Sequence, residues 1–186
     1  MVFEFKPKPF ITFWFVLSNL IVLWDATYVL SRPHSMPGGK WHALWKPYAL
    51  YAEIDYVYGF PAYEEKDGFP SAQAFMTLVE AFFNWIYVYT SYFSTNQSTR
   101  ITGALIGFAS ATSCFSKTTL YMLCEYFSGF KYVGHNPWHR LVFLYIIPSA
   151  PWIFVSLYSL LTIGGQLKRG LLQVPDKKAS VAKKTK

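Results

Sequence analysis

The sequence predicts an all-α integral membrane protein with four membrane-spanning helices. Of its 186 residues, 53% are hydrophobic and only 15% are charged, whereas soluble domains carry about 25% charged residues. The apolar residues fall into four long blocks, and three of these blocks contain a charged residue away from their ends: Asp25, Glu80 and Lys117. A charge in the hydrocarbon core costs at least about 3 kcal/mol. These three residues are therefore the first candidates for function.

The first predicted span covers residues 10–30, after a short basic head at 1–9. It is long enough to cross a hydrocarbon core of about 30 Å. Arg32 and Pro33 end it, and residues 31–70 form the longest loop. Aromatic residues are dense between 41 and 60. Two interpretations are open: an amphipathic segment that lies on the membrane or caps the bundle, or a belt of interfacial aromatic residues.

The other three spans are expected at residues 72–93, 101–127 and 141–163. The third is rich in glycine, alanine and serine, which favour close helix packing in membranes. The fourth contains Pro148 and Pro151, so we expect a break in its middle, beside a cavity. The domain organisation is therefore a head at 1–9, a membrane domain at 10–167 and a basic tail at 168–186.

Lysine and arginine predict the orientation. They are more numerous on the side that holds both termini, so both ends should be cytosolic. Lys183 and Lys184 match the dilysine retrieval signal of the endoplasmic reticulum. Much of the net charge of +7 lies in this tail, so a nucleic-acid partner is not expected. Cys114 and Cys124 are ten residues apart on one predicted helix, about 15 Å by rise, and cannot form a disulfide.

The polar residues of the spans are expected at similar depths below the lumenal side. By helix rise, Asp25 lies about 7 Å deep, Glu80 about 12 Å and Lys117 about 15 Å, with Ser149 and Trp152 at about 12 to 16 Å. Two acids near one lysine can hold one proton between them, as an acid–base pair requires. The alternative is a structural polar knot that holds the helices together.

The candidate site therefore has two groups of residues. The candidate catalytic residues are Asp25, Glu80 and Lys117, and the candidate substrate-binding residues are Trp152, Ser149, Trp85, Asn84, Tyr121 and Glu125. Loop residues His135 and His139 are too few for a metal site and stay unassigned. We expect no metal and no organic cofactor.

Six short segments resemble the EXPERA-domain membrane proteins, which include a sterol delta-8,delta-7 isomerase and the sigma-2 receptor. They are DATYVL (25–30), WKPYALYAEIDYVYG (45–59), LVEAFF (78–83), TLYMLCEYFSGF (119–130), the Gly134-His135 pair and SAPW (149–152). The sequence looks most like the fungal branch. The resemblance implies a bundle of four or five helices with a lipophilic pocket in its lumenal half.

By position, the resemblance implies that Asp25 and Glu80 are the acids of the first and second helices. It also implies that Trp152 is the tryptophan that faces a carbocation in the isomerase, and that Ser149 stands where the isomerase has asparagine. Two departures are Ile21, where the isomerase has histidine, and Lys117, which is not an isomerase residue.

Three functions are compatible with the sequence. The first is an acid–base enzyme, isomerase-like or opening an epoxide, that acts on a sterol, terpenoid or polyketide. The second is a sterol- or amphiphile-binding protein without catalysis, like the sigma-2 receptor. The third is an assembly factor without a pocket. The expected partners are a lipophilic small molecule and membrane lipid, with a homodimer possible, and the expected location is the endoplasmic-reticulum membrane.

Overall fold

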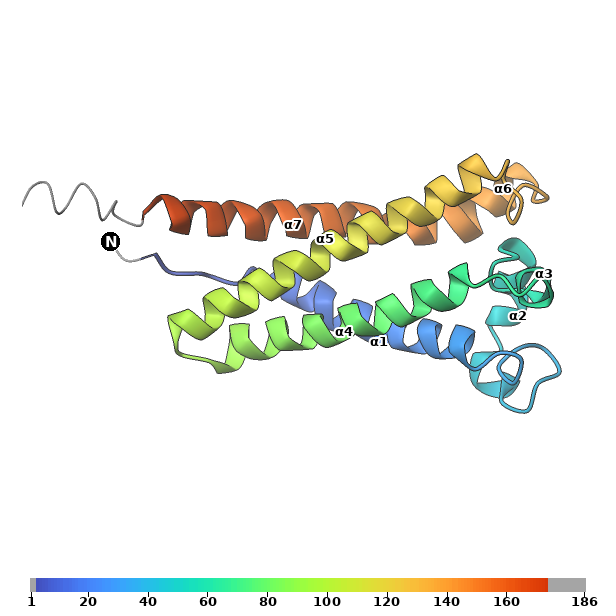
Figure 1. Ribbon diagram of the computed structural model, residues 1–186, viewed down its shortest axis with the longest axis horizontal. Helices are drawn as coiled ribbons and strands as arrows, with labels where there is room; N and C mark the ends of the chain where they lie inside the picture. Colours follow the sequence, from blue (N-terminus) through green and yellow to red (C-terminus); the bar gives the residue numbers. More distant parts are fainter. Residues whose placement is uncertain (1–2, 174–186) are drawn as a thin grey trace, which may run out of the picture.

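The computed structural model describes residues 3–173, and all regular structure in this range is helical. Four long helices run side by side: α1 (Pro9–Leu30), α4 (Phe69–Phe93), α5 (Gln97–Phe127) and α7 (Ile147–Leu172) (Figure 1). Close helix pairs form in the order α1 with α4, α4 with α5, and α5 with α7. The all-α prediction is therefore confirmed.

Five short elements lie at the end of the bundle opposite the N-terminus (Figure 1). They are η1 (His42–Trp45), α2 (Tyr48–Ile54), α3 (Phe60–Glu64), α6 (Trp138–Leu141) and the π-helical turn η2 (Val142–Ile146). Trp45 and Tyr48 are buried against Tyr28 of α1. The loop at 31–70 thus caps the bundle, as one of the two interpretations predicts.

Local sequence explains where the helices begin and end. Pro9 opens α1, where its missing N–H costs no hydrogen bond. The Asn96 side chain accepts a hydrogen bond of 2.8 Å from the backbone N–H of Ser98 and caps the start of α5. After α5, Gly129 takes a positive φ of 72°, a conformation that glycine adopts at little cost.

Glycines allow the long helices to approach closely. A Cβ at Gly107 of α5 would lie 2.5 Å from the Tyr87 ring of α4. A Cβ at Gly164 of α7 would lie 2.8 Å from the Phe108 ring of α5. Small residues of α5 are buried where it meets its neighbours, namely Gly103, Ala104, Gly107, Ser110 and Ala111.

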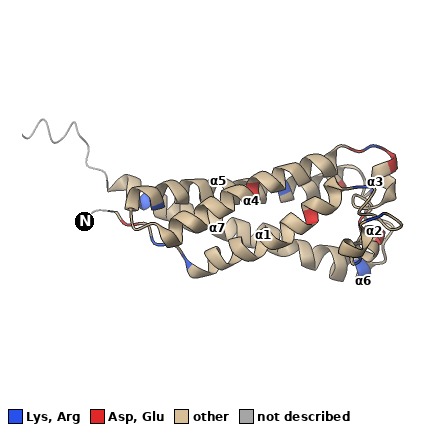
Figure 2. Cartoon of the chain, turned by 90° about the horizontal axis from the view of Figure 1, so that it is seen from below, with Lys and Arg blue, Asp and Glu red and all other residues tan. Residues whose placement is uncertain are grey.

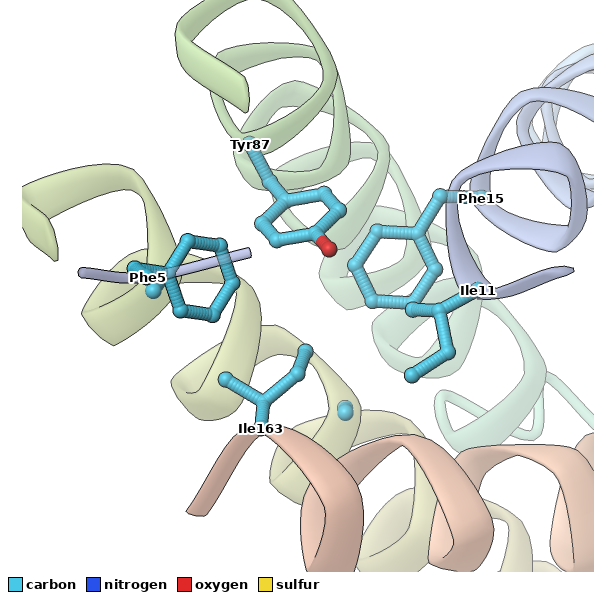
Figure 3. Close-up of a cluster of buried hydrophobic side chains, with 7 residues drawn as sticks. Phe5, Ile11, Phe15, Tyr87 and Ile163 are labelled. Carbon is cyan, nitrogen blue, oxygen red and sulfur yellow. The ribbon is translucent and has the colours of Figure 1, made fainter. Parts of the chain in front are cut away.

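The N-terminal segment packs into the bundle. Phe5 is fully buried among Ile11, Phe15, Tyr87 and Ile163 (Figure 3). Two side-chain amides hold the segment: Gln97 accepts from the backbone N–H of Phe5 and Gln166 from that of Lys6, each at 3.2 Å. This cluster closes the end of the bundle away from the short elements.

Two helical segments are long and apolar enough to cross a membrane: Pro9–Leu30 and Trp138–Leu172. In the second segment, only 11% of the most apolar stretch is buried. Helices α4 and α5, of 25 and 31 residues, are long enough but more polar. Four spans thus remain a prediction. Figure 2 shows charged residues mainly at the two ends of the bundle. Lys183 and Lys184 lie outside the described residues.

The expected break in the fourth span takes another form. Pro148 stands in the first turn of α7, and Pro151 lies inside that helix without ending it. The irregularity comes earlier, in η2, where the backbone N–H of Ile147 bonds to the carbonyl of Val142. Proline at 148 cannot donate a hydrogen bond and crowds the preceding turn. A wider π-helical turn accommodates this without breaking the helix.

Candidate functional site

A partly open cavity of about 420 Å³ lies between the four long helices and beneath the capping loop. This volume is within the range of pockets that hold drug-sized ligands, about 300 to 1,000 Å³. Most of the exposed wall is apolar. Its polar lining residues include Asp25, Glu80 and Lys117. The structure therefore brings the three candidate catalytic residues to one cavity.

Glu80 and Lys117 form an ion pair across the cavity wall. The Lys117 Nζ lies 2.8 Å from the Glu80 Oε2, and the side chains are only 18% and 8% exposed. The Lys117 ammonium also donates to the Thr77 hydroxyl. The Gln73 amide donates to the Lys117 carbonyl at 3.3 Å. Two helices, α4 and α5, thus position this charge pair.

Asp25 is held separately, by two tyrosine hydroxyls of the capping loop. Tyr48 donates to Oδ1 at 2.5 Å and Tyr58 donates to Oδ2 at 3.2 Å. Burial is the main cause that raises the pKa of both tyrosines well above 10, and the Asp25 charge adds to it. Both hydroxyls therefore keep their protons at neutral pH and remain donors.

Two indole groups fix the loop that carries these tyrosines. The Trp24 Nε1 donates to the Leu44 carbonyl at 3.1 Å, and the Trp45 Nε1 donates to the Trp24 carbonyl at 2.9 Å. The Tyr48 ring stacks on the Tyr28 ring with 4.1 Å between centroids. The capping loop is therefore tied to the end of α1, directly beside Asp25.

Asp55 is a buried acid that the sequence analysis did not select. It is fully buried behind the cavity wall; the Tyr121 hydroxyl and the backbone N–H of Val57 donate to its carboxyl group. Its pKa is raised to about 7, mainly by burial; the hydrogen bonds from Tyr121 and Val57 lower it, and the charges of Glu125 and Asp25 add to the rise. An acid set among apolar and aromatic residues, as in IDYVYG (54–59), is the sequence signal that could have identified it.

A chain of polar side chains crosses three helices at the deep end of the cavity. The Asn84 amide donates to Asn19 Oδ1 at 3.0 Å, and the Ser110 hydroxyl donates to Asn84 Oδ1 at 2.8 Å. The Asn19 amide in turn donates to the Ala81 carbonyl at 3.0 Å. Asn84 and Ser110 line the cavity, so a ligand would meet an uncharged polar surface here.

Helix α7 supplies the remaining wall. Ser149 and Trp152 line the cavity together with Trp14 of α1. The centroids of the Trp14 and Trp152 rings are 5.3 Å apart. Cys114 also lines the cavity, and both cysteines are free.

The structure does not bring two of the candidate substrate-binding residues into the cavity. Trp85 is 42% exposed and lies outside the cavity lining. It follows Asn84 in α4, and successive helical residues point about 100° apart. Glu125 is buried below the cap, where its carboxylate accepts from the backbone N–H of Tyr132 at 3.2 Å. Glu125 therefore holds a loop.

The loop histidines have structural contacts. The His135 ring stacks on the Tyr56 ring at 3.8 Å, and its Nε2 lies 2.7 Å from the Glu53 carbonyl. Within residues 3–173, no group of three or more His, Cys, Asp or Glu side chains is arranged to hold a metal ion.

Comparison with protein-family models, curated proteins and solved structures gives no match.

Proposed function

We propose that this chain is a four-span membrane protein whose cavity performs acid–base chemistry on a lipophilic small molecule. The observation that carries the proposal is the Glu80–Lys117 pair, 2.8 Å apart, in the wall of a largely apolar cavity. Charged groups are costly in such surroundings unless paired. A pair of charged groups in the wall of an apolar pocket favours a functional site over a structural one.

The surface of α7 supports a membrane environment. Large apolar side chains are more than half exposed along this segment: Phe143, Ile147, Phe154 and Leu161. Water would meet a large continuous apolar surface there, which soluble monomers rarely expose. Such a surface favours a lipid environment over water. By the lysine and arginine distribution, both termini are cytosolic and the capping loop is lumenal, and we assign the endoplasmic reticulum as the location.

The two acidic positions suit different steps of proton transfer. By helix rise, Asp25 is about 7 Å from the capped end and Glu80 about 16 Å, so they stand about 9 Å apart along the bundle. Glu80, with Lys117 beside it, can remove or return a proton in mid-cavity. Asp25 and the Tyr48 and Tyr58 hydroxyls form a second donor group nearer the cap. An acid and a base along one cavity can serve double-bond isomerisation or epoxide opening.

Trp152 provides a surface for a cationic intermediate. An indole face can stabilise a desolvated cation by about 2 kcal/mol. Trp152 and Trp14 line the same cavity as the charge pair. We therefore propose a sterol, terpenoid or polyketide substrate, in which protonation of a double bond or an epoxide creates such charge.

A product assay tests the proposal. Wild-type protein and the Glu80→Gln variant are expressed in yeast that lacks sterol delta-8,delta-7 isomerase, and lipid extracts are analysed by mass spectrometry. We expect delta-7 sterols with the wild type and a loss of about 100-fold or more in the variant. Glu53→Gln is the matched control, because Glu53 is an exposed acid paired with Arg140 at 3.5 Å. Equal product from Glu80→Gln contradicts the proposal.

A second candidate function is binding without catalysis. The ion pairs among residues 3–173 do not include Asp25, so its carboxylate is free to pair with the amine of a cationic amphiphile. This function predicts saturable binding that Asp25→Asn abolishes, with no product from any substrate. Absence of sterol product from the wild type, together with such binding, would favour this candidate.

A further inference from the structure

The Lys117 ammonium has more N–H donors than oxygen partners among the described residues. A lysine ammonium carries three N–H donors. Among the described residues, the Lys117 Nζ has two oxygen partners, the Glu80 carboxylate and the Thr77 hydroxyl. Lys117 also lines the cavity. The third position on the nitrogen therefore has no partner within residues 3–173, and a ligand in the cavity can reach it.

The Glu80 carboxylate can convert the Lys117 ammonium into a nucleophilic amine by accepting one proton from it. Transfer of one proton from the ammonium to the Glu80 carboxylate leaves a neutral amine beside a neutral acid. Apolar surroundings disfavour separate charges, so the cavity does not oppose this transfer. A neutral lysine amine in an apolar pocket attacks carbonyl carbon atoms and forms Schiff bases. An arginine at this position would keep the charge but lose this chemistry.

We propose that Lys117 forms an imine with a lipophilic aldehyde or ketone that enters the cavity. The amine nitrogen bonds to the carbonyl carbon, and the carbonyl oxygen takes a proton from Glu80. The nitrogen then returns a proton to Glu80, which passes it to the carbinolamine hydroxyl. That hydroxyl leaves as water, the C=N bond forms, and the product is a protonated imine beside the Glu80 carboxylate.

Charge conservation supports this assignment. Before the reaction the site holds one ammonium and one carboxylate; afterwards it holds one protonated imine and the same carboxylate. The Glu80–Lys117 site holds one positive and one negative charge in both states, so the reaction avoids the large cost of an unpaired charge there. The proposal rests on the cavity of the proposed function, but it needs no proton transfer by Asp25.

The shape and lining of the cavity indicate the class of carbonyl compound. Lining residues run from Trp14 to Val29 along α1, a span of about 22 Å by helix rise. Lys117 and Glu80 lie at mid-length between the tyrosines of the cap and the Asn84–Ser110 pair. An elongated hydrocarbon with one carbonyl group, such as a terpenoid aldehyde, matches this arrangement.

Reductive trapping tests the inference. Full-length protein in lipid nanodiscs is incubated with farnesal and sodium cyanoborohydride, and the labelled lysines are located by peptide mass spectrometry. We expect at least about tenfold more label on Lys117 than on the exposed Lys66, because a bound aldehyde is held at high effective concentration. Farnesol, which has the same skeleton but no carbonyl group, should suppress the Lys117 label and leave the Lys66 label unchanged.

The Lys117→Arg variant is the matched control, because it keeps a cation beside Glu80. It should lose the label at 117 and keep the label on Lys66. Labelling of Lys117 no faster than Lys66 in the wild type, or labelling that farnesol does not reduce, overturns the inference without any variant. The two proposals fail separately: trapping without sterol turnover supports the imine alone, whereas turnover without trapping overturns the imine alone.

Discussion

Replacing Lys117 with methionine should destabilise the bundle strongly, because it leaves the Glu80 carboxylate buried without its cation. At 2.8 Å, the attraction between the two charges is about 6 kcal/mol for an effective dielectric constant of about 20. Desolvation offsets much of this attraction, and removal of one partner of a buried pair typically costs about 3 to 5 kcal/mol. For a chain of this size, that corresponds to a fall in Tm of about 6 to 20 °C.

Thermal unfolding of the detergent-solubilised protein at pH 8 measures this loss. The double variant Lys117→Met with Glu80→Gln should recover most of it, to within about 1 to 2 kcal/mol of the wild type, because no charge is then buried. Lys131→Met is the matched control: its pair with Glu65 is exposed, and its loss should leave Tm nearly unchanged. A single variant as stable as the wild type, or a double variant no more stable than the single one, would refute the reasoning.

Two further predictions concern the cap and the helix contacts. Asp55 has a raised pKa of about 7, against about 3.9 unfolded, so the stability it contributes is present below pH 4 and is lost as the pH rises to 7, by about 4 kcal/mol. Asp55→Asn should remove this part of the pH dependence, and an unchanged pH profile in urea unfolding would contradict the assignment. Gly107→Ala should lower the free energy of unfolding by about 1 to 3 kcal/mol, because its Cβ would meet the Tyr87 ring at 2.5 Å. Gly165→Ala is the control: it has open space around it and should raise Tm slightly. Equal effects of the two changes would disprove this packing.

The sequence predicts the helices and the depth of their charges well, because both depend on spacing along the chain. Apolar runs locate the four long helices, and the helix rise places Glu80 and Lys117 at similar depths, where the structure pairs them. The rotation of each helix about its own axis cannot be predicted in this way, because it depends on packing against neighbouring helices. Asn84 therefore lines the cavity and the adjacent Trp85 does not.

The capping loop shows what spacing cannot predict. Asp55 and Tyr121 are 66 residues apart, and their contact forms only when the loop folds back over α5. The same applies to Tyr48 and Tyr58, which meet Asp25 from the loop. A loop has no fixed period from which to deduce the direction of a side chain. The sequence therefore does not predict the roles of Tyr48, Asp55 and Tyr58, because the aromatic residues of this loop allow more than one interpretation.

The buried N-terminal segment has a consequence for biosynthesis. The backbone N–H of Lys6 bonds to Gln166, 160 residues later, and Phe3 packs where a Cβ at Gly170 would stand. Residues 3–6 can therefore reach their places only after α7 has been synthesised. Contacts of such long sequence separation form slowly. A chain truncated before residue 163 would leave Phe5 without part of its packing surface, so this end of the bundle can close only after α7 has been synthesised.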